Sequence, residues 1–120
     1  MKKNKKIICF EIDGIICKTN GLAYRKSKPI LINIEKINEL YDRGYYIKLY
    51  TSRYMDESNN KLSIIKKKND IVTKPQIKKW GVRYHELIYG KPLYSLFIDD
   101  KNLFYKKNWN NLIEKQIKKI

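Results

Sequence analysis

The chain has 120 residues, with 27 lysines and arginines against 12 aspartates and glutamates, so its formal charge is +15 at pH 7. This length and a hydrophobic share of 42% suit one domain with one core, not a two-domain enzyme with a large lid. No apolar run approaches the ~20 residues of a membrane-spanning helix, and Glu11 and Asp13 interrupt the apolar run behind the basic start, which argues against export. With two cysteines, too few for a disulfide framework, we expect a single cytoplasmic domain over residues 1–120.

The first half of the chain predicts two strands, a flap and a helix. The apolar run Ile7–Ile12 indicates a short buried strand. Residues 14–30 begin at a turn signal, are mostly polar and predict a loop or small flap. Asn33 can cap a helix, in which apolar residues recur at helical spacing until Gly44 ends it. The run Tyr45–Tyr50 predicts the second strand.

The second half predicts further strands and helices in alternation. A lysine-rich helix is expected over residues 56–69, and Thr73 is placed to cap the next helix. Glu86–Tyr89 and Leu93–Ile98 predict the third and fourth strands, and Asn110–Ile120 a final helix. Strands that alternate with helices in a short chain indicate an α/β fold with a mostly parallel sheet and right-handed crossovers.

Polar side chains stand where these strands end. They are Glu11 and Asp13 after the first strand, Thr51, Ser52 and Arg53 after the second, Lys91 before the fourth, and Asp99 and Asp100 after it. Any one of them has an ordinary explanation as a turn residue. However, α/β proteins bind ligands at the carboxyl ends of parallel strands, where these residues are expected to meet. Neighbouring carboxylates repel unless a cation holds them, and oxygen ligands favour Mg²⁺, while lysine and hydroxyls suit a phosphate.

Several stretches resemble motifs of the haloacid dehalogenase superfamily. Its four motifs are similar to Ile7–Cys17, Leu49–Arg53, Gly90–Pro92 and Phe97–Asp100. Further stretches resemble the small capless phosphatases of bacterial capsule and surface-polysaccharide clusters: Tyr24 to Pro29, Ile37–Tyr41 and Trp80–Leu87. The resemblance covers nearly the whole chain. It implies a single Rossmann-like domain without a cap, with helices around a mostly parallel sheet.

The resemblance implies catalytic roles for four residues. Glu11 would attack phosphorus and form an acyl-phosphate, and Asp13 would protonate the leaving oxygen and then activate water. Thr51 and Lys91 would hold the phosphoryl oxygens, and backbone N–H groups around residues 13–15 would add donors.

The resemblance also implies a Mg²⁺ cofactor. The metal would be held by the Glu11 carboxylate, the Asp13 backbone carbonyl and the Asp99 carboxylate, with Asp100 supporting them.

Glu11 departs from the family, which has aspartate at this position. Glutamate is longer by one methylene, about 1.5 Å, and a misplacement of about 1 Å can lower a rate roughly 100-fold. Either glutamate is native and the protein is slow or degenerate, or this chain is an impaired aspartate-to-glutamate variant of an active enzyme. With the other motifs intact, the sequence favours the variant.

Five residues are candidates for binding the substrate: Ser52, Arg53, Tyr24, Arg25 and His85. Ser52 and Arg53 follow the second motif, although a surface ion pair is an ordinary role for such an arginine. Tyr24 and Arg25 lie on the flap, where loops commonly determine specificity. His85, the one histidine of the sequence, precedes a strand and is a candidate to face the substrate from a neighbouring loop or subunit, although a structural role is the more common alternative.

The expected function is hydrolysis of a small phosphomonoester (a sugar, polyol or amino-alcohol phosphate) in capsular polysaccharide biosynthesis. We expect a homo-oligomer, because similar small capless phosphatases assemble as tetramers. Either the flap or a neighbouring subunit would close the site. The lysines are spread along the chain and form no nucleic-acid signature, so neither nucleic acid nor membrane is an expected partner. The alternative is a non-catalytic relative that binds a phosphorylated ligand or a protein.

Overall fold

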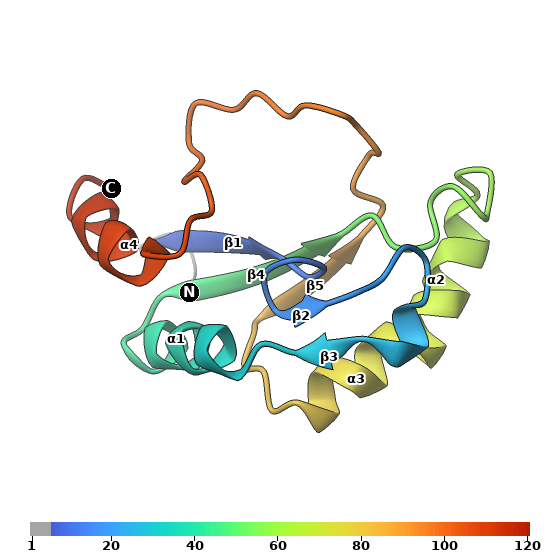
Figure 1. Ribbon diagram of the computed structural model, residues 1–120, viewed down its shortest axis with the longest axis horizontal. Coiled ribbons are helices and arrows are strands. Elements are labelled where there is room, and N and C mark those ends of the chain that lie inside the picture. The colour runs from blue at the N-terminus through green and yellow to red at the C-terminus, as the bar shows by residue number, and fades with distance from the viewer. Residues whose placement is uncertain (1–5) are drawn as a thin grey trace.

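The computed structural model describes residues 6–120, so residues 1–5 of the predicted domain lie outside the description. Three strands form a parallel sheet in the order β1–β4–β5. They are β1 (Ile7–Glu11), β4 (Tyr46–Thr51) and β5 (Glu86–Tyr89). Helices flank this sheet (Figure 1), which confirms the predicted α/β fold.

The helices follow the predicted order, with shifted bounds. They are α1 (Leu31–Asp42), α2 (Leu62–Ile71), α3 (Thr73–Lys79) and α4 (Trp109–Ile117). The core is formed by apolar side chains from the strands, the helices and the start of the flap. Its fully buried members include Ile12, Ile16, Ile37, Leu40, Ile47, Leu49 and Ile77.

Two predicted helix caps are wrong. α1 begins at Leu31, so Asn33 lies inside its first turn and is buried. Its amide donates to the Ile15 carbonyl (2.7 Å) and accepts from the Trp109 indole (2.9 Å), which ties α4 to α1 and to the flap. Thr73 likewise lies inside α3, and its hydroxyl is used in buried side-chain hydrogen bonds. In both cases a buried polar partner replaces the capping role.

The flap over residues 14–30 is an ordered hairpin. Its strands, β2 (Cys17–Lys18) and β3 (Lys28–Pro29), pair antiparallel, and the 3₁₀ turn η2 (Tyr24–Lys26) lies between them. Gly14 opens the flap with a φ of +91°, a conformation that glycine adopts without a steric penalty. The flap therefore starts immediately after Asp13, at the carboxyl end of β1.

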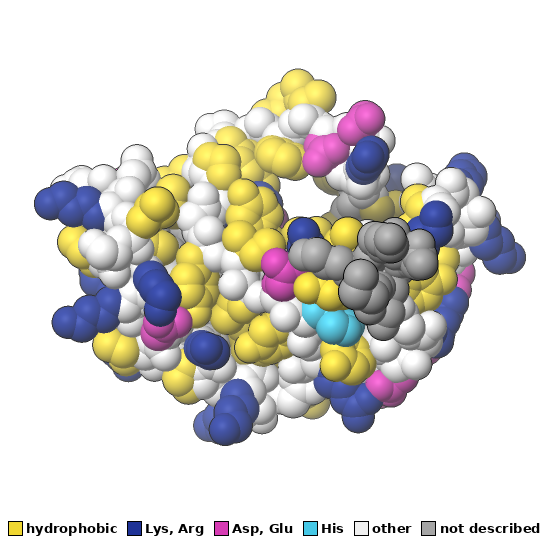
Figure 2. Space-filling model, turned by 180° about the vertical axis from the view of Figure 1, so that it is seen from behind, with side chains coloured by type: hydrophobic (Ala, Val, Ile, Leu, Met, Phe, Trp, Pro, Cys, Tyr) yellow, Lys and Arg dark blue, Asp and Glu magenta, His cyan; other side chains and the backbone are white. Residues whose placement is uncertain are grey.

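The predicted fourth strand, Leu93–Ile98, is wrong. Residues 92–108, here called the 92–108 segment, contain no strand and arc past β1 before reaching α4 (Figure 1). Only Gly90 and Lys91 separate this segment from β5, whereas a parallel neighbour needs a crossover of a dozen or more residues. The apolar residues of the segment are exposed instead, with Leu96 at 77% and Ile98 at 87%. Figure 2 shows an opening beneath the arc.

Within residues 6–120, no helix combines the length and apolar character that crossing a membrane requires.

Candidate functional site

The ends of the three parallel strands bring Glu11, Thr51 and Lys91 together. Glu11 is the last residue of β1 and Thr51 the last residue of β4. Lys91 follows β5 by two residues, and its backbone N–H donates to the Thr51 carbonyl (3.0 Å), which extends the pairing of these strands. The Lys91 Nζ then lies 2.8 Å from Glu11 Oε2. The predicted convergence of these three residues is therefore present.

Lys91 is almost completely buried, with aromatic rings around its ammonium group. Its Nζ donates to the Tyr94 hydroxyl (2.8 Å) and lies 5.0, 5.3 and 5.8 Å from the ring centres of Tyr94, Phe97 and Tyr50. Burial favours the neutral amine, but the hydrogen bonds with Glu11 and Tyr94 outweigh it and raise the pKa of Lys91. These contacts therefore favour the charged form of Lys91 despite its burial.

Asp13 follows β1 and is held by donors on its inner side. Arg53 Nε donates to Oδ2 (2.9 Å), and Arg53 Nη2 donates to Oδ1 (2.9 Å). The Thr19 hydroxyl from the flap donates to the same Oδ1 (2.5 Å). In these contacts both oxygens of the Asp13 carboxylate act as hydrogen-bond acceptors.

Arg53, a predicted substrate-binding residue, is not open to solvent in this structure. Its side chain is fully buried beneath Asp13, where it is bound in a two-point ion pair. Its backbone N–H donates to the Thr51 hydroxyl (3.1 Å), which keeps its own hydrogen available for another acceptor. Ser52, between them, is half-buried at the strand end.

The two flap candidates differ in their surroundings. The Tyr24 ring packs on the Tyr54 ring (4.8 Å between centres) and over the Arg53 guanidinium (4.9 Å), so it is part of the flap's packing. Arg25 is exposed on η2, where a ligand can reach it. Of these two residues, Arg25 is the one whose exposure suits contact with a ligand.

His85 lies at the opposite end of the sheet, so within one chain it does not meet Glu11, Thr51 and Lys91, and a contact across a subunit interface stays a prediction. It precedes β5 and pairs with Ile47, the second residue of β4. The candidate site lies at the other end of β4, after its last residue. Its ring is stacked between Tyr41 and Tyr46, with centres 4.6 and 4.4 Å away. The structural alternative for this histidine fits these contacts.

The structure does not bring Asp99 and Asp100 to Glu11. Both are exposed on the 92–108 segment, and Asp99 Oδ1 accepts from the Lys101 backbone N–H (2.9 Å). Among residues 6–120, no three His, Cys, Asp or Glu side chains lie together as a metal-binding group. In this arrangement Lys91 neutralises Glu11 and Arg53 neutralises Asp13, so these residues do not fit a Mg²⁺ ion.

The turn after Asp13 uses N–H groups that were expected to bind phosphate. The Gly14 N–H donates to the Cys17 carbonyl (2.8 Å), and the Ile15 N–H donates to the Ile12 carbonyl (3.3 Å). These bonds close the turn on itself, so the predicted donors at residues 14 and 15 are already occupied.

Thr19, Ser27 and Gln76 belong to this site but were missed in the sequence. Thr19 and Gln76 each touch a charged partner, Asp13 and Arg53 respectively, and Ser27 touches Arg53 as well. They come from the flap and from α3, and each is an ordinary polar residue in its local sequence. Their role arises only from tertiary contacts.

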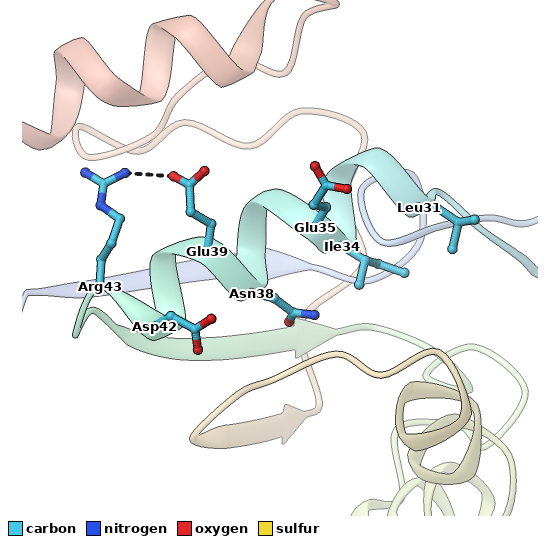
Figure 3. A pocket seen from close by; sticks show the side chains of 7 residues that line it. All are labelled: Leu31, Ile34, Glu35, Asn38, Glu39, Asp42 and Arg43. Carbon is cyan, nitrogen blue, oxygen red and sulfur yellow. Dashed lines mark hydrogen bonds and ion pairs between the residues drawn. The ribbon is translucent and has the colours of Figure 1, made fainter.

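A separate shallow groove runs along α1, away from the strand ends (Figure 3). Its lining residues are Leu31, Ile34, Glu35, Asn38, Glu39, Asp42 and Arg43. Glu39 pairs with Arg43 (2.9 Å), and Asp42 pairs with Arg83. Since these charges already have protein partners, the groove is not a better candidate than the strand ends.

Comparisons with known proteins support the fold and no more. The chain matches no known family profile, and no curated protein is similar to it. It is similar to a crystal structure of a target protein from Vibrio cholerae, with a TM-score of 0.77 and 22% sequence identity. The match covers 93% of this chain and 98% of the other. At this identity the likeness establishes a shared α/β architecture, in agreement with the parallel sheet described above.

Proposed function

We propose that this chain is a phosphatase of the haloacid dehalogenase type that hydrolyses a small phosphomonoester. The observation that supports it best is the Glu11–Lys91 contact of 2.8 Å beside Thr51, at the carboxyl ends of parallel strands. A carboxylate nucleophile, a buried cation and a hydroxyl are the groups that such a reaction needs within reach of one phosphoryl group.

The proposed reaction has two displacements. In the first, a Glu11 carboxylate oxygen bonds to phosphorus while the ester P–O bond breaks, and the departing alkoxide takes the proton of the Asp13 carboxyl group. Water then attacks the acyl-phosphate, gives a proton to the Asp13 carboxylate and releases inorganic phosphate. Lys91 and the Thr51 hydroxyl stabilise the charge on the phosphoryl oxygens in both steps.

Glu11 explains why this chain is expected to be slow. Its carboxylate reaches Lys91 directly, so the cation meant for the phosphate is paired with the nucleophile. Replacing it by aspartate withdraws the carboxylate by about 1.5 Å, which leaves Lys91 free to bind phosphate. The proposal therefore includes that this chain is an impaired aspartate-to-glutamate variant.

Mg²⁺ belongs to the proposal as a prediction from the sequence motifs. The carboxylates of the folded chain do not form its site, so Mg²⁺ dependence requires that the 92–108 segment carry Asp99 closer to Glu11. The exposure of the apolar residues of this segment gives a reason to expect that it can repack.

The leaving group is expected to meet aromatic and basic side chains. Tyr94 and Phe97 are about half exposed beside Lys91, and Arg25 is exposed on the flap. These groups suit a sugar, polyol or amino-alcohol phosphate, and we place the enzyme in capsular polysaccharide biosynthesis in the cytoplasm. A homo-oligomer is proposed for closing the site, while nucleic acid and membrane are not proposed as partners.

A non-catalytic phosphate-binding protein is the second candidate. It is favoured by the closed Glu11–Lys91 pair and by the exposure of Asp99 on the 92–108 segment, outside that pair. It predicts that inorganic phosphate binds to the chain with Glu11 or with aspartate at that position, without turnover of either protein.

The experiment that tests the proposal is phosphate release with Mg²⁺ by this chain and by its Glu11→Asp variant. The panel contains sugar, polyol and amino-alcohol phosphates and nucleotides. We expect the variant to be faster by at least about 100-fold, and Glu35→Asp, on exposed α1 surface, is the matched control. If neither protein releases phosphate from any ester, the phosphatase proposal is wrong and the binding alternative becomes the better one.

A further inference from the structure

Arg53 has the largest completely buried side chain in the part of the chain that the structure describes, although it is charged. A buried charge is very costly unless it is paired and its hydrogen-bonding groups are satisfied. Burial opposes the charged form, but the hydrogen bonds and the charge of Asp13 outweigh it and raise the pKa of Arg53. So many compensating contacts indicate that the position of this guanidinium matters.

The guanidinium joins three parts of the fold. At the strand end, Nε and Nη2 each lie 2.9 Å from an oxygen of Asp13. Toward α3, Nη1 donates to Gln76 Oε1 (2.6 Å). Toward the flap, Nη2 donates to the Ser27 hydroxyl (3.1 Å), and the Tyr24 ring covers the guanidinium.

Ile16 and Cys17 anchor the start of the flap in the core, and further attachments of the flap run through the same groups as the Arg53 contacts. The Thr19 hydroxyl lies 2.5 Å from Asp13 Oδ1 and 2.6 Å from the Ser27 hydroxyl. The Gln76 amide donates to the Tyr24 carbonyl (2.7 Å). Since β2 and β3 are only two residues long, these side-chain bonds contribute much of what holds the flap in place.

We propose that Arg53 is a positioning residue that holds the flap and the Asp13 carboxylate in one fixed arrangement and does not bind the substrate phosphate. This positioning role deepens the proposed function. Only the part that concerns the catalytic role of Asp13 rests on that function. The fork geometry of arginine is essential, because Arg53 donates from three separate nitrogens, whereas a lysine would donate from a single one.

The first test is hydrogen exchange, which needs no turnover. Arg53→Met and Arg53→Lys are compared with Arg83→Met, an exposed arginine before β5. The flap amides of Ser27 and Ile30 are hydrogen-bonded to the Tyr24 and Ile16 carbonyls and are the reporters. In both Arg53 variants we expect these two amides to exchange at least about tenfold faster, while the β4 amides stay protected. Arg83→Met should leave exchange in the flap and in β4 unchanged.

The second test is steady-state kinetics in the Glu11→Asp protein. A positioning residue lowers kcat, by about 100-fold for a misplacement near 1 Å, and leaves KM within about threefold, with no rescue by Arg53→Lys. A phosphate ligand instead raises KM strongly, with part of the affinity restored by lysine. A large rise in KM with flap protection intact overturns the proposal, and so does unchanged flap protection in both Arg53 variants.

Gln76→Leu keeps the proposal falsifiable if Arg53 variants do not fold. It removes one acceptor of the guanidinium and the bond to the Tyr24 carbonyl, and it leaves the Arg53–Asp13 pair in place. We expect faster exchange in the flap, and normal exchange there overturns the proposal. If the Glu11→Asp protein is inactive while exchange follows these expectations, the phosphatase function fails but the positioning role stands.

Discussion

His85 and Ile47 are joined by two reciprocal hydrogen bonds. The Ile47 backbone N–H donates to His85 Nδ1 (3.0 Å), and the His85 backbone N–H donates to the Ile47 carbonyl (2.8 Å). In the first of these bonds the Nδ1 atom of the imidazole is the acceptor. Because Tyr41 and Tyr46 enclose the ring on both faces, the histidine fixes the entry into β5.

We expect His85→Ala to destabilise the protein without altering its chemistry. The change leaves the Ile47 N–H without its side-chain partner and removes the ring between two tyrosines, at a cost of about 2–3 kcal/mol. Urea unfolding measures the loss, and His85→Asn, which retains an acceptor, should lose less. A large fall in kcat/KM of the Glu11→Asp protein with unchanged stability would restore the substrate role of His85.

The sheet followed from local patterns, except at the 92–108 segment. Apolar runs predicted β1, β4 and β5, because a buried strand needs such a run wherever it pairs. The run Leu93–Ile98 has the same character, but a strand also needs a neighbour. The two residues between β5 and this segment leave no room for a crossover to a parallel neighbour, and this constraint depends on topology.

The candidate site was predictable where strand ends determine it. Glu11, Thr51 and Lys91 meet because parallel strands end at the same edge. The direction of Arg53 was not predictable, since acceptors on the flap and on α3 draw its guanidinium inward. Asn33 shows the same limit: its residue type indicates a cap, but a buried tertiary partner determines its place.

Lys91→Met in the Glu11→Asp protein is expected to lower kcat/KM by at least about 100-fold, because it removes a buried cation from the developing phosphoryl charge. Methionine has a similar volume and can pack among the rings of Tyr50 and Tyr94. Phosphate release measures the loss, with Lys67→Met on exposed α2 surface as the control. Undiminished activity would assign the phosphate contact to a different cation and contradict the proposed role of Lys91.

Mg²⁺ should reduce tryptic cleavage at Lys101, if it binds through Asp99 as the sequence motifs predict. Lys101 is exposed on the 92–108 segment, where the backbone is open to the protease. In the Glu11→Asp protein we expect cleavage there to slow at least about fivefold with Mg²⁺, while cleavage at Lys67 stays the same.

Asp99→Asn should abolish this protection, because the amide cannot replace the charge of the carboxylate. If the Glu11→Asp protein needs Mg²⁺ for activity but cleavage at Lys101 does not respond to the metal, the 92–108 segment takes no part in the metal site.

The attachment of α4 to α1 should weaken in acid because of Glu114. Arg43 (2.8 and 3.1 Å) and Lys36 hold its carboxylate, and their hydrogen bonds lower its pKa from 4.5 to about 2. A lowered folded-state pKa means that this stability is complete above pH 4.5 and is lost as the pH falls toward 2. Since the pair is partly exposed, solvent screening limits the loss to roughly 1 kcal/mol. Urea unfolding measures the free energy of unfolding at pH 6 and at pH 3. Between these pH values it should decrease less for Glu114→Gln than for the unmodified chain. Equal decreases would mean that this network does not stabilise α4.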